Sequence, residues 1–257
     1  MIFKNDYEFN MFGIYNYKKP GKLTKLIKFI KENHKTLKGD ILESGVFQGS
    51  QSLAIAMLLK ELGSEKKVYA FDSFSGFPNV YHANDNKDKF QSLYENNIIS
   101  KDHYENYLNF IKLKKLRSEG NLENTPSSIS SSGDFSENSL DSLKSKTKLL
   151  KLDNIVFVKG DFEITMNEDN KLSPVLSNGI MSAIIDCDLY ESYRVTLNFL
   201  SKKLNRGGLV YLDEYYSLKF PGARIATNEA IATSSNFKLE LDKREDGDFE
   251  RWYLSCQ

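Results

Sequence analysis

The sequence predicts an α/β fold in which most strands of the sheet run parallel. Short apolar, β-rich runs alternate with helical patterns along the 257 residues, and such runs are typical of parallel strands covered on both faces. Near the C-terminus, two segments alternate apolar with polar residues instead, which predicts an antiparallel hairpin. The length fits one domain over residues 1–257 with a sizeable buried core.

Five parallel strands are expected at the apolar runs. They are Ile41–Val46, Val68–Phe71, Ile155–Val158, Ala183–Cys187 and Leu209–Leu212. The stretch Ser50–Leu62 is an almost wholly apolar helix that ends at Gly63. Glu191–Leu204 is predicted as a crossover helix, and Gly207 and Gly208 are expected to end it.

The two ends of the chain differ from this alternation. Residues 1–38 form an N-terminal helical segment, and one apolar stripe of it consists of Leu23, Leu26, Ile27 and Ile30. At the other end, Asp246 and Gly247 mark the turn of the hairpin. Its alternating apolar residues are Phe237, Leu239, Leu241, Trp252, Leu254 and Cys256. These two strands bring the predicted sheet to seven.

Residues 79–151 interrupt the alternation, and we interpret them as an insertion. Lys101–Arg117 has a polar helical pattern, whereas Ser118–Ser139 is rich in Ser, Asn and Gly and has few apolar residues to bury. Disorder or high mobility is therefore the expected state of that stretch. It is either a surface loop or a lid over the substrate, and the sequence leaves both open.

The composition argues against several kinds of partner. Lys plus Arg and Asp plus Glu both number 35, so no net charge favours nucleic acid or an anionic membrane. The first residues place charges where a signal peptide needs an apolar stretch, and no run approaches membrane-spanning length. Two cysteines are too few for a disulfide framework. We therefore expect a cytoplasmic protein that binds neither nucleic acid nor membrane.

Two glycines stand where the first strand turns into the first long apolar helix. Gly45 and Gly49 follow Glu43 there, so the backbone can approach a ligand closely. The dinucleotide fingerprint is absent, because Phe47 occupies the place of its middle glycine. Asp72 ends the second strand, where its carboxylate can accept both hydroxyls of a ribose. The turn and Asp72 together predict a nucleoside site.

A third candidate for this nucleoside site follows the strand Ile155–Val158. Gly160, Asp161 and Phe162 are suited to hold an adenine between an apolar face and a hydrogen-bonding carboxylate. Taken alone, the same residues fit a simple turn equally well.

Acidic residues follow two successive strands of the predicted sheet. Asp186 and Asp188 close one strand, and Asp213 and Glu214 close the next. Ligands in open α/β sheets bind at the carboxyl ends of the strands, where converging carboxylates repel one another unless a cation or a shared proton intervenes. Oxygen ligands alone favour a hard cation such as Mg²⁺. The sequence therefore predicts a magnesium site at this edge.

Five segments, in this order, resemble the macrocin O-methyltransferase family, whose members methylate sugar hydroxyls. They begin at Glu43, Phe71, Gly160, Asp186 and Asp213 and read ESGVFQG, FDSFSGFP, GDF, DCDLYES and DEY. The resemblance implies a class I methyltransferase fold, which is a Rossmann-like, mostly parallel seven-stranded sheet. It also implies an O-methyltransferase that depends on S-adenosylmethionine and uses Mg²⁺.

The resemblance assigns residues to two parts of the site. S-adenosylmethionine would be held by Glu43, Gly45, Gly49 and Asp72, with Ser73 and Asp161 close by. Mg²⁺ would be held by Asp186, Asp213 and Glu214. Many relatives have Asp-Gly-Asp and Asp-Asp-Tyr where this chain has Cys187 and Glu214. The acceptor would be a small-molecule sugar, either a nucleotide-linked deoxysugar or a glycoside, and a homo-oligomer is compatible with the sequence.

Methylation of a sugar hydroxyl also needs a group that accepts the proton. Asp186 and Asp188 are the nearest candidates, because no lysine stands three positions after either of them. The histidines are expected at the surface, and among them only His82 is near enough to the expected cofactor to compete as a base. Aromatic residues border the acidic pairs and either line a sugar site or simply pack: Tyr190, Tyr215 and Tyr216.

Three other functions stay open. Asp186 and Asp188, separated by one residue, also fit a metal-dependent glycosyltransferase that binds a nucleotide-sugar through Mg²⁺. Against it, this pair follows a glycine turn that already accounts for a nucleoside-sized ligand. A nicotinamide-dependent dehydrogenase is disfavoured because Gly-x-Gly-x-x-Gly is absent. A non-catalytic binding protein on the same fold is the third alternative.

Overall fold

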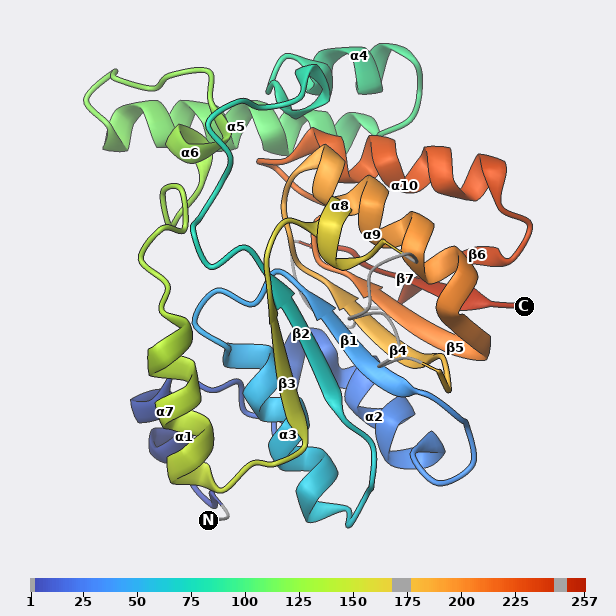
Figure 1. Cartoon of the computed structure of the whole chain (residues 1–257). Helices are drawn as coiled ribbons and strands as arrows, with labels where there is room; N and C mark the ends of the chain where they lie inside the picture. The colour runs from blue at the N-terminus through green and yellow to red at the C-terminus, as the bar shows by residue number, and fades with distance from the viewer. Residues whose placement is uncertain (1–2, 168–176, 243–248) are drawn as a thin grey trace.

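The sheet of this protein has seven strands in the order β3-β2-β1-β4-β5-β7-β6. The computed structural model describes residues 3–167, 177–242 and 249–257. The strands are β1 (Asp40–Ser44), β2 (Val68–Asp72), β3 (Ile155–Lys159), β4 (Ile180–Ile185), β5 (Leu204–Leu212), β6 (Phe237–Asp242) and β7 (Arg251–Cys256). Strands β1 to β5 pair in parallel, and β7 is antiparallel to both β5 and β6 (Figure 1). The predicted seven-stranded, mostly parallel sheet with a C-terminal antiparallel hairpin is confirmed.

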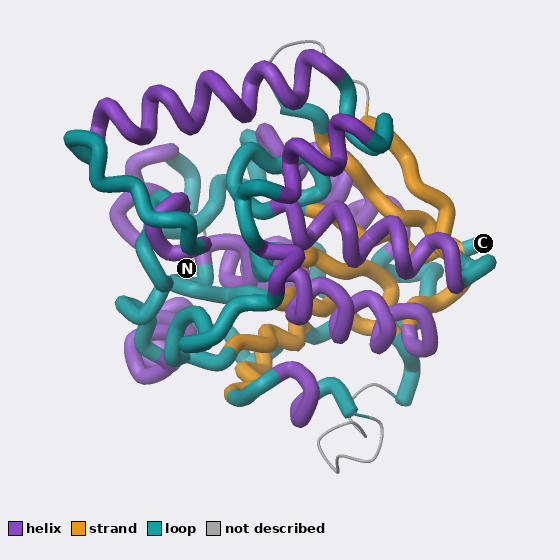
Figure 2. Tube along the Cα trace, turned by 90° about the horizontal axis from the view of Figure 1, so that it is seen from above, coloured by secondary structure: helices purple, strands orange, loops and turns teal. Residues whose placement is uncertain are grey.

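Helices cover both faces of the sheet (Figures 1 and 2). One face packs against α1 (Asp6–Phe12), α2 (Thr24–Asn33), α3 (Ser50–Glu61) and α7 (Leu140–Leu150). The other face packs against α8 (Phe162–Thr165), α9 (Tyr190–Lys203) and α10 (Pro221–Thr233). Successive strand residues point to opposite faces, so Ile41 belongs to the first core and Leu42 to the second. Both faces of each inner strand are therefore apolar, as the sequence runs predicted.

The strand register aligns the carboxyl ends of four neighbouring strands. Ser44, the last residue of β1, pairs with Phe71 of β2 and with Ile185 of β4. Ile185 in turn pairs with Leu212 at the end of β5. The residues that directly follow these strands therefore meet at one edge of the sheet. They are the residues from which the nucleoside and metal sites were predicted.

Residues 79–151 contain η2 (Ala83–Asp85), α4 (Lys89–Glu95), α5 (Lys101–Arg117), α6 (Pro126–Ile129) and α7. Helices α4 and α5 share a small apolar core made by Phe90, Leu93, Ile99 and Tyr107. They lie with α10 at one end of the molecule, and α5 runs along its periphery (Figures 1 and 2). The guanidinium of Arg224 in α10 donates to the carbonyl of Ile98 at 2.9 Å, which ties α10 to this unit.

The Ser-rich stretch Ser118–Ser139 follows a defined path through the structure. It contains α6, where Ile129 is buried, and the carbonyl of Ser130 accepts from Lys114 Nζ at 2.8 Å. Mobility of this stretch stays a prediction. The interpretation of residues 79–151 as an insertion into a single domain stays a prediction too.

Two expectations about strand boundaries need correction. Gly207 and Gly208 lie inside β5 and do not end α9, because the chain passes directly from α9 into β5 and Leu204 already pairs with Ile180. Cys187 lies beyond β4, since the strand ends at Ile185, although the cysteine is buried. The local pattern located both elements and missed their ends.

The expectation that the histidines lie at the surface is wrong for His103. Its ring stacks on Tyr216 at 4.1 Å between centroids, and its Nε2 lies 2.8 Å from the carbonyl oxygen of Ser217, so it is buried between α5 and the loop after β5. The turn predicted at Asp246 and Gly247 lies outside the described residues. Within the described ranges, no helix combines the length and apolarity needed to cross a lipid bilayer.

Candidate active site

The glycine turn after β1 lies directly against the chain that leaves β4. Gly45 has a φ of 84°, and a Cβ on it would lie 1.8 Å from the carbonyl oxygen of Asp186. Only glycine fits this approach, because a side chain would collide with backbone that cannot give way. The turn ends where α3 begins, after Gly49. The sequence therefore brings the predicted nucleoside turn and the first predicted metal ligand into contact.

Asp72 at the end of β2 holds this turn in place. Its Oδ2 accepts from the backbone N–H groups of Val46 at 2.7 Å and Phe47 at 3.0 Å. Its Oδ1 accepts from the N–H of Phe74 at 2.7 Å. The carboxylate thus joins the ends of two neighbouring strands by binding the backbone of the turn. Binding of a ribose by Asp72 stays a prediction.

The other residues assigned to S-adenosylmethionine are engaged in different ways. Glu43 is buried below the turn, where it accepts from the Ser52 hydroxyl of α3. Burial and the carboxylate of Asp186 raise the pKa of Glu43 well above its ordinary value. The hydroxyl of Ser73 donates to the carbonyl of Gly76 at 3.1 Å within the next turn. Asp161 is exposed at the end of β3 and caps α8 by accepting from the Glu163 N–H at 2.7 Å.

Three of the predicted acidic residues form one cluster. Asp186, Asp213 and Glu214 each offer a carboxylate oxygen, and these oxygens all lie within 4.8 Å of one another. The fourth acid, Asp188, is buried beside them with a φ of 60° but does not belong to this set. Convergence of the acidic pairs after β4 and β5 is therefore as predicted, with Asp188 set apart.

Lys22 contributes the nearest positive charge to this cluster. It lies in η1 (Gly21–Leu23), and its Nζ is 2.7 Å from Asp213 Oδ1 and 3.7 Å from Asp186 Oδ2. The side chain is 28% exposed. Nothing in the local sequence distinguishes Lys22 from the other lysines of the N-terminal segment. Its partner Asp213 lies 191 residues further along the chain, so no local pattern indicates the contact.

The electrostatics of the cluster follow from four carboxyl groups and one ammonium group. Burial and the carboxylate of Asp186 raise the pKa of Asp188 and the pKa of Glu214 well above their ordinary values. For Asp213, burial favours the protonated form, but the ammonium of Lys22 and the hydrogen bond from Tyr211 act together against burial, and the pKa of Asp213 lies below its ordinary value. One lysine cannot neutralise this many acids, so the cluster favours protons or a further cation.

Uncharged side chains of α3, α9 and β5 orient the carboxylates of the cluster by hydrogen bonds. The hydroxyl of Tyr193 in α9 donates to Glu214 Oε2 at 2.5 Å, and the hydroxyl of Tyr211 in β5 donates to Asp213 Oδ1 at 2.8 Å. The amide of Gln51 in α3 donates to Asp186 Oδ2. Each acid therefore has its own support from a buried element. Nothing in the sequence singles out these three residues, because they are ordinary members of helix and strand patterns.

The aromatic residues near the acids belong mainly to packing contacts. Tyr190 stacks on His82 at 4.3 Å, and its hydroxyl donates to Glu229 at 2.7 Å. Tyr215 lies under the guanidinium of Arg224, with 4.2 Å to the ring centroid. His82 is exposed; its Nδ1 accepts from the Asn84 N–H at 3.1 Å, and its Nε2 lies 3.9 Å from Glu191.

Asp85 of η2 connects residues 79–151 to the start of α9. Its Oδ1 accepts from the Tyr190 N–H at 2.7 Å, and the residue is only 4% exposed. Burial raises the pKa of Asp85 from 3.8 to about 6. The bond satisfies an otherwise unpaired N–H in the first turn of the helix. This contact lies two residues from Asp188.

Asp85→Asn is expected to change how stability depends on pH. Because the folded protein holds the Asp85 proton more tightly than the unfolded chain, the stability from that proton is present below about pH 4 and is lost as the pH rises through about 6. Asn keeps an acceptor for Tyr190. The variant should therefore gain stability relative to the wild type across this window, by up to about 3 kcal/mol. Urea unfolding at several pH values measures the difference, with exposed Asp102→Asn as control, and a pH-independent difference would contradict the expectation.

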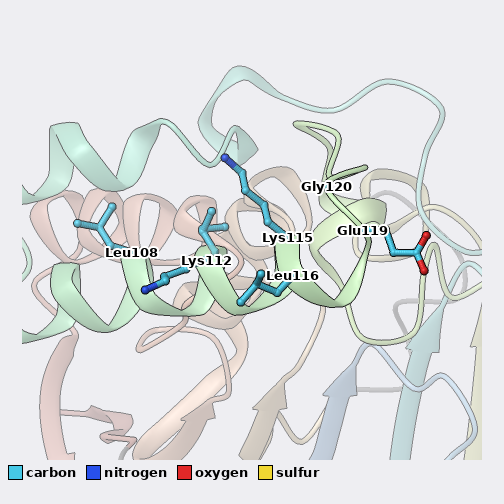
Figure 3. A pocket seen from close by; sticks show the side chains of 7 residues that line it. Leu108, Lys112, Lys115, Leu116, Glu119 and Gly120 are labelled. Atoms are coloured by element: carbon cyan, nitrogen blue, oxygen red, sulfur yellow. The ribbon is translucent and has the colours of Figure 1, made fainter.

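A surface pocket of about 500 Å³ lies on α5, apart from these residues (Figure 3). Leu108, Lys112 and Leu116 contribute to its lining, and none of the predicted site residues does. The predicted site is therefore the edge of the sheet and not this pocket.

Comparison with known proteins bears on the fold and the family. The model of the macrocin-O-methyltransferase (TylF) family matches residues 14–118. The predicted resemblance is confirmed. This match contains the glycine turn and Asp72, whereas the acidic cluster follows it in the chain. The placement of the acids therefore depends on the geometry described above.

One curated relative and two solved structures extend this finding. The 8-demethyl-8-(2,3-dimethoxy-alpha-L-rhamnosyl)-tetracenomycin-C 4'-O-methyltransferase of Streptomyces olivaceus is 27% identical over 179 residues, which are 69% of this chain and 53% of that protein. The chain thus matches about half the length of this relative. The O-methyltransferase NovP has a TM-score of 0.60 at 20% identity, covering 91% of this chain and 79% of its own. The calicheamicin methyltransferase CalS11 has a TM-score of 0.58 at 18% identity, covering 98% of this chain and 80% of its own. The predicted class I methyltransferase fold is confirmed.

Proposed function

We propose that this chain is an S-adenosylmethionine-dependent O-methyltransferase that methylates a sugar hydroxyl with the help of Mg²⁺. One observation carries the proposal: the glycine turn and Asp72 lie side by side with the cluster of Asp186, Asp213 and Glu214 at one edge of the sheet. A nucleoside site thereby adjoins a cation site. The names of the macrocin family and of the Streptomyces olivaceus relative, which acts on a rhamnosyl group, support a sugar as acceptor.

The residues present fit both groups that the reaction needs. For the nucleoside, the glycine turn packs directly on the chain that leaves β4, and Asp72 beside the turn carries a carboxylate suited to a ribose hydroxyl. For the cation, the three ligand oxygens lie within 4.8 Å of one another, and a set of carboxylates alone suits Mg²⁺. We therefore assign Glu43, Gly45, Gly49, Asp72, Ser73 and Asp161 to the cofactor side.

The reaction needs an ionisable hydroxyl placed in line with an activated methyl group. S-adenosylmethionine supplies the methyl on a sulfonium, and a bound Mg²⁺ lowers the pKa of an oxygen attached to it. Asp186, Asp213 and Glu214 would hold the cation, and the hydroxyls of Tyr211 and Tyr193 orient two of these acids by hydrogen bonds. Asp188 stands outside the set of three and is the carboxylate left to accept the proton. The role of Asp186 is then that of a ligand.

A calorimetric titration separates the proposed function from its alternatives. We expect S-adenosylmethionine to bind and NADH and a UDP-sugar not to bind. If the protein were a metal-dependent glycosyltransferase, the UDP-sugar would bind instead, through a metal held by Asp186 and Asp188. A turnover assay with nucleotide-linked deoxysugars and with glycosides then decides between an enzyme and a non-catalytic binding protein. Binding of S-adenosylmethionine without methyl transfer to any sugar would favour the latter.

Lys22→Met is expected to tighten binding of a divalent cation. Lys22 contacts two of the three proposed ligands, so its ammonium and the cation compete for the same carboxylates. Removing the competing charge should lower the Kd for Mn²⁺, a paramagnetic probe for Mg²⁺, by about tenfold, or about 1.4 kcal/mol. Electron paramagnetic resonance of free Mn²⁺ measures this directly. Lys25→Met is the matched control, because Lys25 is similarly exposed but pairs with Glu240 at 3.1 Å. Unchanged or weaker binding in Lys22→Met would show that the lysine does not compete.

A further inference from the structure

Part of the Ser-rich stretch packs on the turn that follows β2. The carbonyl of Asp134 accepts from the Phe77 N–H at 2.7 Å. Gly76 has a φ of 82°, and a Cβ on it would lie 2.5 Å from the same carbonyl oxygen. Such an approach is open only to glycine. The two segments are therefore fitted to each other at backbone level, so the contact does not depend on flexible side chains.

Phe135 of this stretch bridges the two turns of the proposed nucleoside site. Its ring lies 5.1 Å from Phe47 of the glycine turn, edge to face, and 5.0 Å from Phe77 of the turn after β2. Aromatic contacts of this kind add to the stability of packing. Residues 134–138 therefore lie over the proposed cofactor side of the site, whereas the sequence leaves open a surface loop or a lid over the substrate.

Asp72 has too few free positions to bind both ribose hydroxyls. A carboxylate offers about four acceptor positions. Three of them are taken by the N–H groups of Val46, Phe47 and Phe74 at 2.7–3.0 Å. The fourth position, on Oδ1, has only a long contact at 3.4 Å from Asn138 Nδ2, so at most one ribose hydroxyl can bind there and a second needs a different acceptor.

Asn138 presents that acceptor. Its Nδ2 lies 3.4 Å from Asp72 Oδ1, which is a long contact. Its Oδ1 is buried and finds no hydrogen-bond partner among the described residues. Leaving such an oxygen unpaired is unfavourable, so an unpaired one next to a proposed site points to a ligand that donates.

We propose that Asn138 is part of the cofactor-binding site and accepts a hydrogen bond from one ribose hydroxyl while Asp72 accepts from the other. The proposal rests on the function proposed above and deepens it, because it gives the Ser-rich stretch a role in binding the nucleoside. Asn138 lies outside residues 14–118, the part that the family model matches. The match to the family model therefore does not bear on the proposed role of Asn138.

The test is calorimetric titration with S-adenosylhomocysteine and its 2′-deoxy and 3′-deoxy analogues. Asn138→Ala should weaken binding of S-adenosylhomocysteine by about tenfold, the usual effect of one lost hydrogen bond. In the wild type, the deoxy analogue that lacks the hydroxyl bound by Asn138 should bind about tenfold more weakly than S-adenosylhomocysteine. In Asn138→Ala, the same analogue and S-adenosylhomocysteine should bind equally well. That loss of the difference assigns the bond to one hydroxyl, and a purely structural role of Asn138 would not produce it.

Asn124→Ala is the matched control, because Asn124 belongs to the same stretch but is exposed and donates to Asp88 at 3.1 Å. It should bind all three compounds like the wild type, and thermal unfolding should show all variants folded. This inference alone would be overturned if Asn138→Ala bound S-adenosylhomocysteine as tightly as the wild type does. It would also be overturned if each deoxy analogue lost the same affinity, relative to S-adenosylhomocysteine, in both proteins. A wild type that binds no S-adenosylhomocysteine would overturn the proposed function as well.

Discussion

Asp213→Asn is expected to abolish methyl transfer while leaving S-adenosylmethionine bound. The substitution keeps the shape of the side chain but removes the negative charge that both Lys22 and a cation need. It replaces one of three carboxylates whose oxygens lie within 4.8 Å of one another by a neutral amide, which is a much weaker ligand for a cation. A bound cation contributes several kcal/mol to stabilising charge at the reacting oxygen, so turnover should fall by roughly a thousandfold. The cofactor side of the site lies after other strands, and its affinity should change little.

Chelation provides the parallel measurement. Excess EDTA should reduce turnover of the wild type to the level of Asp213→Asn, and added Mg²⁺ should restore the wild type but not the variant. Asp141→Asn, an exposed acid in the first turn of α7, controls for loss of one negative charge. Full activity of metal-free protein in excess EDTA would remove the cation from the mechanism. The acidic cluster would then act only through its carboxyl groups.

Much of the fold could be predicted because local pattern and global topology agree. The apolar runs predicted all five parallel strands, and strict alternation predicted the hairpin, since both patterns follow from which faces are buried. Acidic residues at strand ends could be assigned to one site for a related reason. In a parallel sheet the register brings Asp72, Asp186 and Asp213 to the same edge, whatever the connections between the strands.

The residues that escaped prediction act through contacts distant in sequence. Lys22 reaches Asp213 across most of the chain, and Asn138 reaches Asp72 from a stretch whose composition predicted disorder. His103 was expected at the surface because its helix is polar, yet its ring stacks on Tyr216. A one-dimensional pattern records the burial of apolar faces. It does not record which single polar side chain a neighbouring segment will contact.

Asp72→Ala is expected to weaken S-adenosylmethionine binding by roughly a hundredfold or more. The substitution removes an acceptor that is charged, and a hydrogen bond to such a group contributes about 1.5–3 kcal/mol. It also frees the N–H groups of Val46, Phe47 and Phe74, so the glycine turn loses the bonds that fix it. Loss of the charged acceptor and loss of the bonds that fix the turn both lower the affinity for S-adenosylmethionine.

The measurement is calorimetric affinity for S-adenosylmethionine, and Mn²⁺ binding serves as an internal control. Since Asp72 ends β2 while the cation ligands follow β4 and β5, the variant should bind Mn²⁺ like the wild type. Parallel loss of both ligands would indicate a misfolded edge of the sheet, and a Ser73→Ala variant then tests the cofactor side with a smaller change. Unchanged S-adenosylmethionine affinity in folded Asp72→Ala would exclude Asp72 from the site. The glycine turn would then have to bind the nucleoside through its backbone and Asn138 alone.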